Sequence, residues 1–379
     1  MKKRMTKVVS VVAMTSLMVG LLAGCGGNTE TPKTDTSAQT TETTQADTSS
    51  ALTSEDVIKK AAATGQVGNW GLGNEYEVLA LLAKYDLPTS FLSQDFTMDG
   101  FDDNSVLLAS AMTYNELGLV KNSYDGGYGY GDTVKVVDMN DEGVAMMEDN
   151  IFCTKAFAAE NPQTVAAFLY ASFKGWEYAV ANPAEAAQIC YEYGSSVSPE
   201  HQDYMATEVA KLISTNTKGE SVSEIGYMDE EAMQQTLDIA KKYVTLDDAS
   251  ANEKFQALTL DDIRDTSFYA AAKESDGTFA VEKKDVSIQL KWLPDAQFMG
   301  YYVALAKGYY TEVGFENVNI VSGGGDIAET TAVNNGTVDF GVTWETNLAS
   351  ADASGMDLVE IAQIFQRSGL VLVYKPENF

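Results

Sequence analysis

Strand-like and helix-like segments alternate along the chain, and this alternation restricts the possible folds more than any other feature of the sequence. Residues 67–70 have the pattern of a short strand, 71–74 that of a turn, and 75–85 that of an amphipathic helix. Further strand-like runs occupy 106–114 and 134–139. The alternation predicts an α/β protein with wound sheets rather than a β-sandwich.

Long helical patterns follow these strands, and several begin at a proline. The dipeptides Asn161-Pro162, Asn182-Pro183 and Ser198-Pro199 place proline in the first turn of a helix, where its missing N–H is not needed. A further helix is expected at 229–244.

A second α/β block follows the polar stretch 271–284. Its first strand, 286–292, alternates apolar and polar residues, as a half-buried strand does. The other expected strands are 318–321, 338–342, 358–365 and 370–374, and the expected helices are 298–307, 327–334 and 346–353.

The charge and the rare residues exclude several classes of protein. The 25 Lys and Arg against 55 Asp and Glu give a net charge of −30, and such a surface repels a nucleic acid backbone. One His and three Cys leave too few residues for a zinc site, a His-dependent triad or a disulfide scaffold. We therefore expect no nucleic acid partner, no metal site, no cofactor and no catalytic residue.

The N-terminus has the pattern of an export signal. Lys2, Lys3, Arg4 and Lys7 precede an apolar stretch at 8–23. The ending Leu22-Ala23-Gly24-Cys25 resembles the lipobox of bacterial lipoproteins, which implies that Cys25 is lipidated and becomes the first mature residue. The alternative is a plain signal peptide or a short membrane anchor. We expect a signal peptide at 1–24 and a disordered polar tether at 25–51, which place the folded part on the extracytoplasmic face of the cell membrane.

Both blocks contain distinctive sequence motifs. In the second block they are Trp292-Leu-Pro-Asp-Ala-Gln-Phe-Met-Gly-Tyr-Tyr-Val-Ala, Lys307-Gly-Tyr-Tyr, Gly323-Gly-Gly-Asp, Asp339-Phe-Gly-Val-Thr-Trp and Phe365-Gln-Arg-Ser-Gly. In the first block they are Gly68-Asn-Trp-Gly-Leu-Gly-Asn-Glu-Tyr-Glu, Ala111-Met-Thr-Tyr-Asn-Glu-Leu and Lys174-Gly-Trp-Glu-Tyr.

Taken in order, these motifs resemble those of one family of transport proteins, the substrate-binding proteins of ABC importers for thiamine pyrimidine precursors such as hydroxymethylpyrimidine and formylaminopyrimidine. These proteins are relatives of the sulfonate and nitrate binders. The second block is similar to the family's first lobe, and the first block to its second lobe and C-terminal helices.

The resemblance implies a two-lobed periplasmic-binding-protein-like fold of type II, with its halves in swapped order. We interpret the order as a circular permutation rejoined through a linker at 271–285; the alternative is a truncated tandem copy. The expected division is 52–150 as the family's second lobe, 151–270 as a helical return segment packing on the first lobe, and 286–379 as the first lobe.

Aromatic and polar residues at strand ends are the candidate ligand-binding set. Ring stacking is expected from Trp70, Tyr76, Tyr114, Trp292 and Trp344, with core packing as the alternative for each.

Glu116 is the expected polar anchor, because a carboxylate accepts from a ring amine and a ring N–H together. Its alternative role is that of an acid favoured in a first helical turn. Asp295 stands where the family usually has Asn, which puts the ligand's identity in doubt, because ionised Asp only accepts. Asn115 and Gln297 complete the set, and Asn74 and Glu345 are weaker candidates.

The remaining chemistry-bearing residues receive structural interpretations. His201 is expected to be exposed at a helix start, and whether Cys153 and Cys190 pair is left open. The glycines 71 and 73 are followed by Tyr76 where a dinucleotide fingerprint needs a third glycine.

The leading functional hypothesis is a lipid-anchored, non-catalytic solute-binding protein that delivers a thiamine pyrimidine precursor to an ABC permease and its ATPase. The alternative ligand class is sulfonate-like or nitrate-like. The resemblance also extends to enzymes that build the thiamine pyrimidine with a sacrificial His, a cofactor-bearing Lys and a Cys cluster, and this chain has no such cluster.

Overall fold

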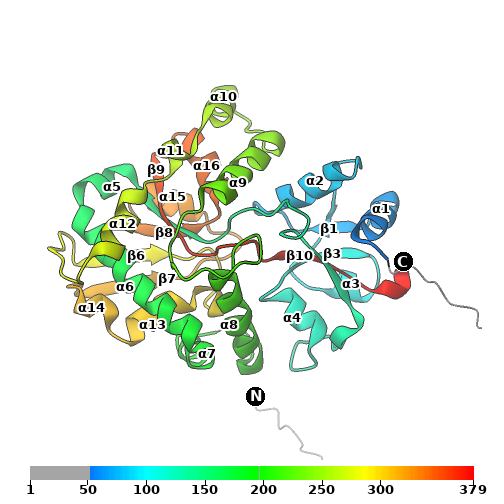
Figure 1. Ribbon diagram of the computed structural model, residues 1–379, viewed down its shortest axis with the longest axis horizontal. Coiled ribbons are helices and arrows are strands. Elements are labelled where there is room, and N and C mark those ends of the chain that lie inside the picture. Colours follow the sequence, from blue (N-terminus) through cyan, green and yellow to red (C-terminus); the bar gives the residue numbers. More distant parts are fainter. Residues whose placement is uncertain (1–51, 196) are drawn as a thin grey trace, which may run out of the picture. The chain divides into compact units, whose positions relative to one another are not determined.

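Two five-stranded sheets form the cores of two lobes in the computed structural model, which describes residues 52–195 and 197–379 (Figure 1). We call the lobe with strand order β2-β1-β3-β10-β4 the N-lobe, and the lobe with order β7-β6-β8-β5-β9 the C-lobe. The N-lobe strands are β1 (Val67–Asn69), β2 (Leu92–Ser93), β3 (Leu108–Met112), β4 (Lys135–Asp138) and β10 (Leu370–Tyr374). The C-lobe strands are β5 (Asn150–Thr154), β6 (Asp285–Gln289), β7 (Asn317–Val321), β8 (Phe340–Thr343) and β9 (Leu358–Gln363).

Each lobe receives one strand from the sequence block that builds the other lobe. Strand β10 lies between β3 and β4 and is antiparallel to both, while β5 lies between β8 and β9 in the same way. The remaining inner pairs, β1 with β2 and β3, and β6 with β7 and β8, are parallel. The two sheets therefore have the same topology, and the predicted α/β, two-lobed periplasmic-binding-protein-like fold is confirmed.

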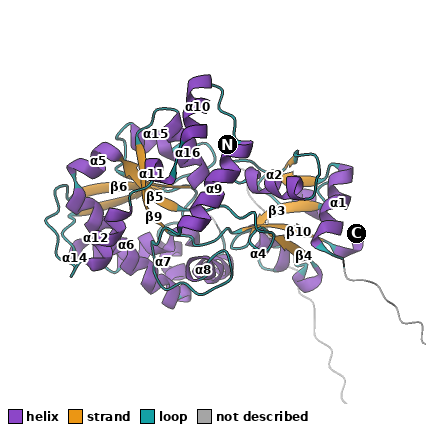
Figure 2. Ribbon diagram, turned by 45° about the horizontal axis from the view of Figure 1, so that its top comes forward, coloured by secondary structure: helices purple, strands orange, loops and turns teal. Residues whose placement is uncertain are grey.

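Helices surround both sheets, and local sequence signals fix where several of them begin (Figure 2). Thr53 and Asp56 form a reciprocal capping box at the start of α1, and the Ser198 side chain caps α8. The proline starts predicted at 162, 183 and 199 are confirmed as the first residues of α6, α7 and α8. In the N-lobe the helices are α1 (Ser54–Thr64), α2 (Glu75–Lys84), α3 (Asp99–Asp102) and α4 (Glu116–Lys121).

The C-lobe carries most of the helical mass. Its elements are α5 (Lys155–Glu160), α6 (Pro162–Ala181), α7 (Pro183–Glu192), α8 (Pro199–Ser214), α9 (Glu230–Tyr243), α10 (Ala249–Ala257), α11 (Leu260–Ile263), α12 (Thr266–Glu274), α13 (Met299–Ala306), α14 (Tyr309–Glu312), α15 (Glu329–Asn334) and α16 (Glu345–Ala353). Helix α6 crosses α13 closely because glycines stand at the contact: a Cβ on Gly300 would lie 2.0 Å from the Trp176 ring, and one on Gly175 would lie 2.1 Å from the Gly300 carbonyl oxygen. Overpacking therefore excludes side chains at both positions.

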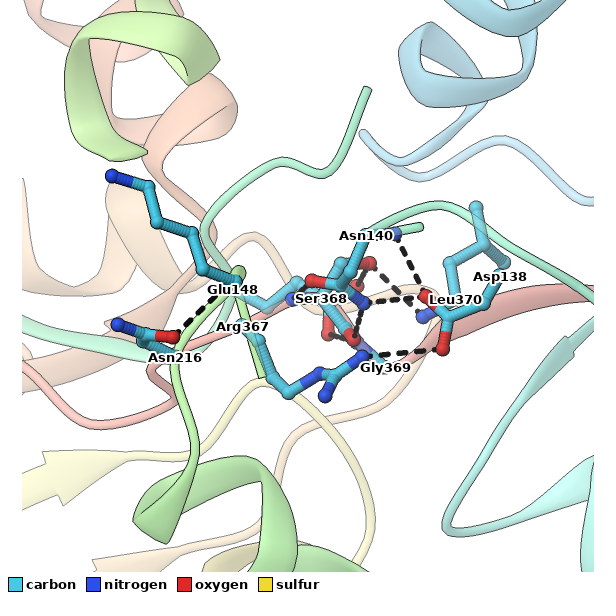
Figure 3. Close-up of polar contacts among 9 residues, drawn as sticks. Asp138, Asn140, Glu148, Asn216, Arg367, Ser368, Gly369 and Leu370 are labelled. Atoms are coloured by element: carbon cyan, nitrogen blue, oxygen red, sulfur yellow. Dashed lines mark hydrogen bonds and ion pairs between the residues drawn. The ribbon is translucent and has the colours of Figure 1, made fainter. Parts of the chain in front are cut away.

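Two chain segments connect the lobes, and polar contacts tie them to each other (Figure 3). We call residues 139–149, between β4 and β5, and residues 364–369, between β9 and β10, the crossing segments. Asn140 Nδ2 donates to the Ser368 carbonyl oxygen at 2.9 Å, and the Glu148 carboxylate accepts from Gly369 N at 3.0 Å. Next to them, the Arg367 guanidinium pairs with Asp138 at 3.2 Å. Because the segments are bonded side by side, they form a paired hinge.

The predicted linker is partly helical and is held to the C-lobe. Helix α12 continues to Glu274, into the first residues of the predicted linker 271–285. Farther on, the Glu282 carboxylate accepts from Thr164 N at 2.7 Å and from Gln163 N at 3.1 Å. Glu282 thereby satisfies free N–H groups of the first turn of α6.

Several predictions fall on residues that the structure does not describe. The predicted signal peptide 1–24, the predicted tether 25–51 and Cys25, which is predicted to be lipidated, all lie outside the described residues. Among the helices of the described residues, none has the length and apolar character needed to span a bilayer.

The contact between Phe379 and α1 predicts that the order of the two sequence blocks can be exchanged without changing the fold. Lys60 Nζ on α1 donates to the Phe379 carbonyl oxygen at 3.3 Å, so a short Gly-Ser linker can join Phe379 to Leu52. We expect a chain that runs 276–379, linker, 52–275 to unfold cooperatively with an unchanged circular dichroism spectrum. The matched control is a chain cut between Ala109 and Ser110, inside β3, which should not fold because β3 is bonded on both sides. Equal unfolding behaviour and equal circular dichroism spectra of the two chains would contradict this prediction.

Candidate functional site

A narrow cavity lies where the two lobes meet. Its volume is about 50 Å³. The lining residues are Trp70, Leu72, Phe96, Met112, Tyr114, Asn115, Glu116, Lys291, Trp292, Gln297 and Trp344. Most of them follow the ends of β1, β3, β6 and β8, as expected for ligand sites at the carboxyl ends of strands. The structure therefore brings together seven of the nine predicted ligand-binding residues.

The aromatic walls differ in how freely they can contact a ligand. Trp70 and Trp292 are half-buried, and Trp292 packs against Phe96 with ring centroids 5.3 Å apart. Tyr114 is 3% exposed and packs edge-on against Phe365. Trp70 and Trp292 are thus the better stacking partners for a ligand.

Glu116 is a buried carboxylate at the start of α4. Its Oε2 accepts from Met112 N at 2.9 Å, and its Oε1 accepts from Asn115 Nδ2 at 2.9 Å. Burial raises the pKa of Glu116 above its usual value, opposed by these hydrogen bonds to the charged form. Each oxygen retains a lone pair, so the carboxylate can accept two more hydrogen bonds from a ligand.

His201 is buried behind Asn115, and the prediction of an exposed histidine is wrong. The side chain is 1% exposed, its Nε2 lies 2.8 Å from Asn115 Oδ1, and its Nδ1 lies 2.5 Å from the Tyr124 hydroxyl. Burial lowers the pKa of His201 to about 4, so the ring is neutral at neutral pH. The side chain turns inward because α8 packs against α4 of the N-lobe, a contact between segments distant in the sequence.

Asp149, in a crossing segment, fixes two residues of the opposite wall. Its Oδ2 accepts from Gln297 Nε2 at 2.8 Å and its Oδ1 accepts from Trp344 Nε1 at 2.9 Å. The backbone of Asp149 has a φ of 43°, a strained value for a residue other than glycine. Burial raises the pKa of Asp149 to about 7. The hinge thereby orients the cavity wall directly.

Lys291 contributes a positive charge that is already paired. Its Nζ lies 2.8 Å from Glu329 Oε1 and 5.0 Å from the centre of the Trp344 ring. Thr343 Oγ1 donates to the same carboxylate oxygen at 2.5 Å. Both members of the ion pair are largely buried, which makes the separation of the pair costly.

Two predicted residues and the weaker candidates lie outside the cavity lining. Tyr76 lines a wider groove beside the cavity, which shares Leu72, Lys291 and Trp292 with it. Asp295 is 3% exposed and accepts from Gln297 N at 2.9 Å, so it shapes the turn beneath the cavity. Asn74 and Glu345 are also buried and do not line the cavity.

Sequence reasoning missed some of the lining residues and one orienting residue. These are Leu72, Phe96, Met112, Lys291 and Asp149. The position of Lys291 just after β6 was a usable signal, whereas Phe96 comes from a loop after β2 that has no pattern of its own.

Comparison with known proteins gives one family match. The family model described as NMT1/THI5 like matches residues 90–186 and 295–378, just under half of the chain, with segments in both lobes. The match supports an assignment to the NMT1/THI5-like family. In general terms it also supports a function as a solute-binding protein or a related function, with a small-molecule ligand and an ABC transporter as partner. Because this family also includes synthases, the match is compatible with the expected non-catalytic role without establishing it. No curated protein and no solved structure gives a significant match.

Burial of Asp295 predicts a stability change with pH. Burial raises the pKa of Asp295 from 3.8 to about 8, so between these values the folded chain holds a proton that the unfolded chain has lost. The free energy of unfolding should therefore fall as pH rises through this window. Asn at position 295 can still accept from Gln297 N and carries no charge.

We expect Asp295→Asn to be more stable than the wild type at pH 8. Its free energy of unfolding should also depend less steeply on pH, with a slope that differs from that of the wild type by up to about 1.4 kcal/mol per pH unit. Urea unfolding from pH 5 to 8 measures this difference. The exposed Asp285→Asn variant is the control and should follow the wild type. Parallel pH profiles for wild type and Asp295→Asn would contradict the assignment.

Proposed function

We propose that the protein is the lipid-anchored, extracytoplasmic solute-binding protein of an ABC importer, and that it binds a thiamine pyrimidine precursor or a similar small heteroaromatic between its lobes. The observation that carries the proposal is the buried Glu116 carboxylate lining one cavity with Trp70 and Trp292. A flat ring with adjacent N–H donors suits this combination. The ring can stack on an indole while the donors bind the carboxylate.

The charges of the cavity favour this ligand class over sulfonates and nitrates. Lys291 is the cation in the lining, and it is engaged by Glu329. An anion entering beside Glu116 would meet a like charge and would have to displace a buried ion pair. The acidic wall therefore selects neutral or cationic donors.

The proposal includes a role in binding rather than in catalysis. His201 lies behind Asn115, and Cys153 and Cys190 are buried free thiols away from the cavity lining. Across residues 52–195 and 197–379, no group of three or more His, Cys, Asp and Glu is arranged to hold a metal ion. A ligand recovered unchanged after prolonged incubation would support binding alone.

The hinge suits a protein that closes on its ligand. The lobes are joined by the two crossing segments, and Asp149 in one of them holds the wall residues Gln297 and Trp344. Movement at the hinge would open the cavity between the lobes and release the solute to the permease.

We also propose that the blocks stand in a circularly permuted order. The Lys60–Phe379 contact, which brings residue 379 to the first helix of the described chain, supports this proposal. The rearranged chain described above tests the required closeness of these segments.

Neutralising the Glu116 carboxylate should weaken ligand binding strongly. In Glu116→Gln one acceptor oxygen becomes an N–H donor that faces the ligand's own donors. We expect hydroxymethylpyrimidine to bind roughly ten- to hundredfold more weakly, as for loss of a hydrogen bond to a charged group. Isothermal titration calorimetry measures the affinity, with Glu253→Gln, exposed on α10, as the control. Binding of alkanesulfonates instead, with no heat from the pyrimidine, would overturn the ligand assignment.

The proposed lipid anchor at Cys25 predicts where the protein is found in the cell. With Cys25 in place the protein should sediment with membranes and partition into detergent, because acyl chains bind the bilayer. Cys25→Ala should lose both properties, whereas Cys190→Ala should keep them. Equal membrane association of wild type and Cys25→Ala in fractionated cells would exclude the lipid anchor.

A further inference from the structure

We propose that His201 is a positioning residue that fixes the direction of the Asn115 amide, so that the cavity offers an N–H donor beside the Glu116 carboxylate. The inference rests on the proposed function and narrows the ligand class. The ligand must present a hydrogen-bond acceptor next to the donors that bind Glu116.

A continuous chain of hydrogen bonds supports this assignment. It runs from the Tyr124 hydroxyl to His201 Nδ1 at 2.5 Å, from His201 Nε2 to Asn115 Oδ1 at 2.8 Å, and from Asn115 Nδ2 to Glu116 Oε1 at 2.9 Å. Glu116 Oε2 accepts from Met112 N, which ends the chain on a backbone donor.

The hydrogen bonds in this series must all run in one direction, from Tyr124 toward Glu116. A carboxylate only accepts, so Asn115 turns its nitrogen to Glu116 and its oxygen to His201. Nε2 of His201 must then carry the proton, and Nδ1 accepts from Tyr124. With its oxygen engaged by His201, Asn115 has a second N–H left for a ligand in the cavity that it lines.

The opposite direction is chemically self-consistent only with a different protonation state. A protonated Glu116 would donate to the Asn115 oxygen, the Asn115 nitrogen would donate to Nε2, and His201 would carry its proton on Nδ1. The histidine tautomer therefore reports which face of Asn115 the ligand meets.

His201 reaches the site from the other lobe. Helix α8 packs mainly against α6 and α7, whereas Asn115 and Tyr124 belong to the N-lobe. On α8, Tyr204 OH donates to the Thr113 carbonyl oxygen at 2.7 Å and its ring packs on Gly118, which holds α8 against α4. The amide is thus oriented when the lobes are together. His201 lies outside the two segments that the family model matches.

The tautomer can be measured directly, because the chain contains one histidine. In the tag-free, ¹⁵N-labelled protein at neutral pH, long-range ¹H–¹⁵N correlation spectra of the imidazole identify the protonated nitrogen. We expect the proton on Nε2. A proton on Nδ1 would mean that these hydrogen bonds run in the opposite direction. It would overturn the inference whether or not any pyrimidine binds.

Ligand selectivity gives a second readout. The probes are hydroxymethylpyrimidine and its two pyridine analogues, in each of which one ring nitrogen is replaced by C–H. We expect the wild type to bind one analogue about tenfold more weakly, as for a lost hydrogen bond, and His201→Phe to reduce this discrimination about fivefold. His201→Gln, which keeps a donor near Nε2, should restore it, and Asp203→Asn, exposed on the same helix, is the control.

The outcomes separate this inference from the proposed function. Equal binding of all three probes by the wild type, or unchanged discrimination in His201→Phe, would overturn the role of His201. If no probe binds the wild type, the proposed ligand class fails, and the tautomer alone decides the direction of the chain. If His201→Phe does not fold, restored discrimination in His201→Gln supports the role of His201, and its loss in a folded His201→Gln contradicts it.

Discussion

The exchange of β5 and β10 between the sheets is the constraint on which the rest of the structure depends. Each exchanged strand is bonded on both sides, so neither lobe completes its sheet without the other block of the sequence. The exchange forces two chain segments to cross between the lobes side by side. It also sets the carboxyl ends of β1, β3, β6 and β8 around one gap, which explains why residues distant in the sequence line a single cavity.

The crossing segments have an unusual electrostatic character. Burial raises the pKa of Glu148 to about 8 and that of Asp149 to about 7, and it raises the pKa of Glu77 in the same direction. Backbone N–H groups and neutral side-chain N–H donors form the hydrogen bonds to these acids, and the charge of Lys291 opposes the rise in the pKa of Asp149. Such a hinge is held by directional hydrogen bonds, and these permit fewer arrangements than ion pairs do. The acids therefore define geometry at some cost in stability near pH 8.

The sequence predicted the parts of the fold that local physics determines. Strand alternation, proline starts and the position of Glu116 after β3 follow from short segments, and the structure has them. The burial of His201 could not be predicted, because it depends on α8 meeting α4 through the Tyr204–Gly118 contact. Tyr76 was placed correctly at the start of α2, but the rotation of that helix turns its side chain to the neighbouring groove. Long-range packing thus decides which strand-end residues line the cavity.

Under the proposed function, closure and selectivity would follow from the same contacts. Tyr124, Asn115 and Glu116 belong to the N-lobe and His201 to the opposite side, so the hydrogen-bond chain is complete when the lobes meet. On the facing wall, Asp149 accepts a hydrogen bond from the side-chain nitrogen of Gln297. The side-chain carbonyl oxygen of Gln297 is left for the cavity. A bound ring would then meet acceptors on both walls and one donor beside Glu116. A ligand with the wrong order of donors and acceptors would leave buried groups unpaired, and that penalty rises as closure excludes water.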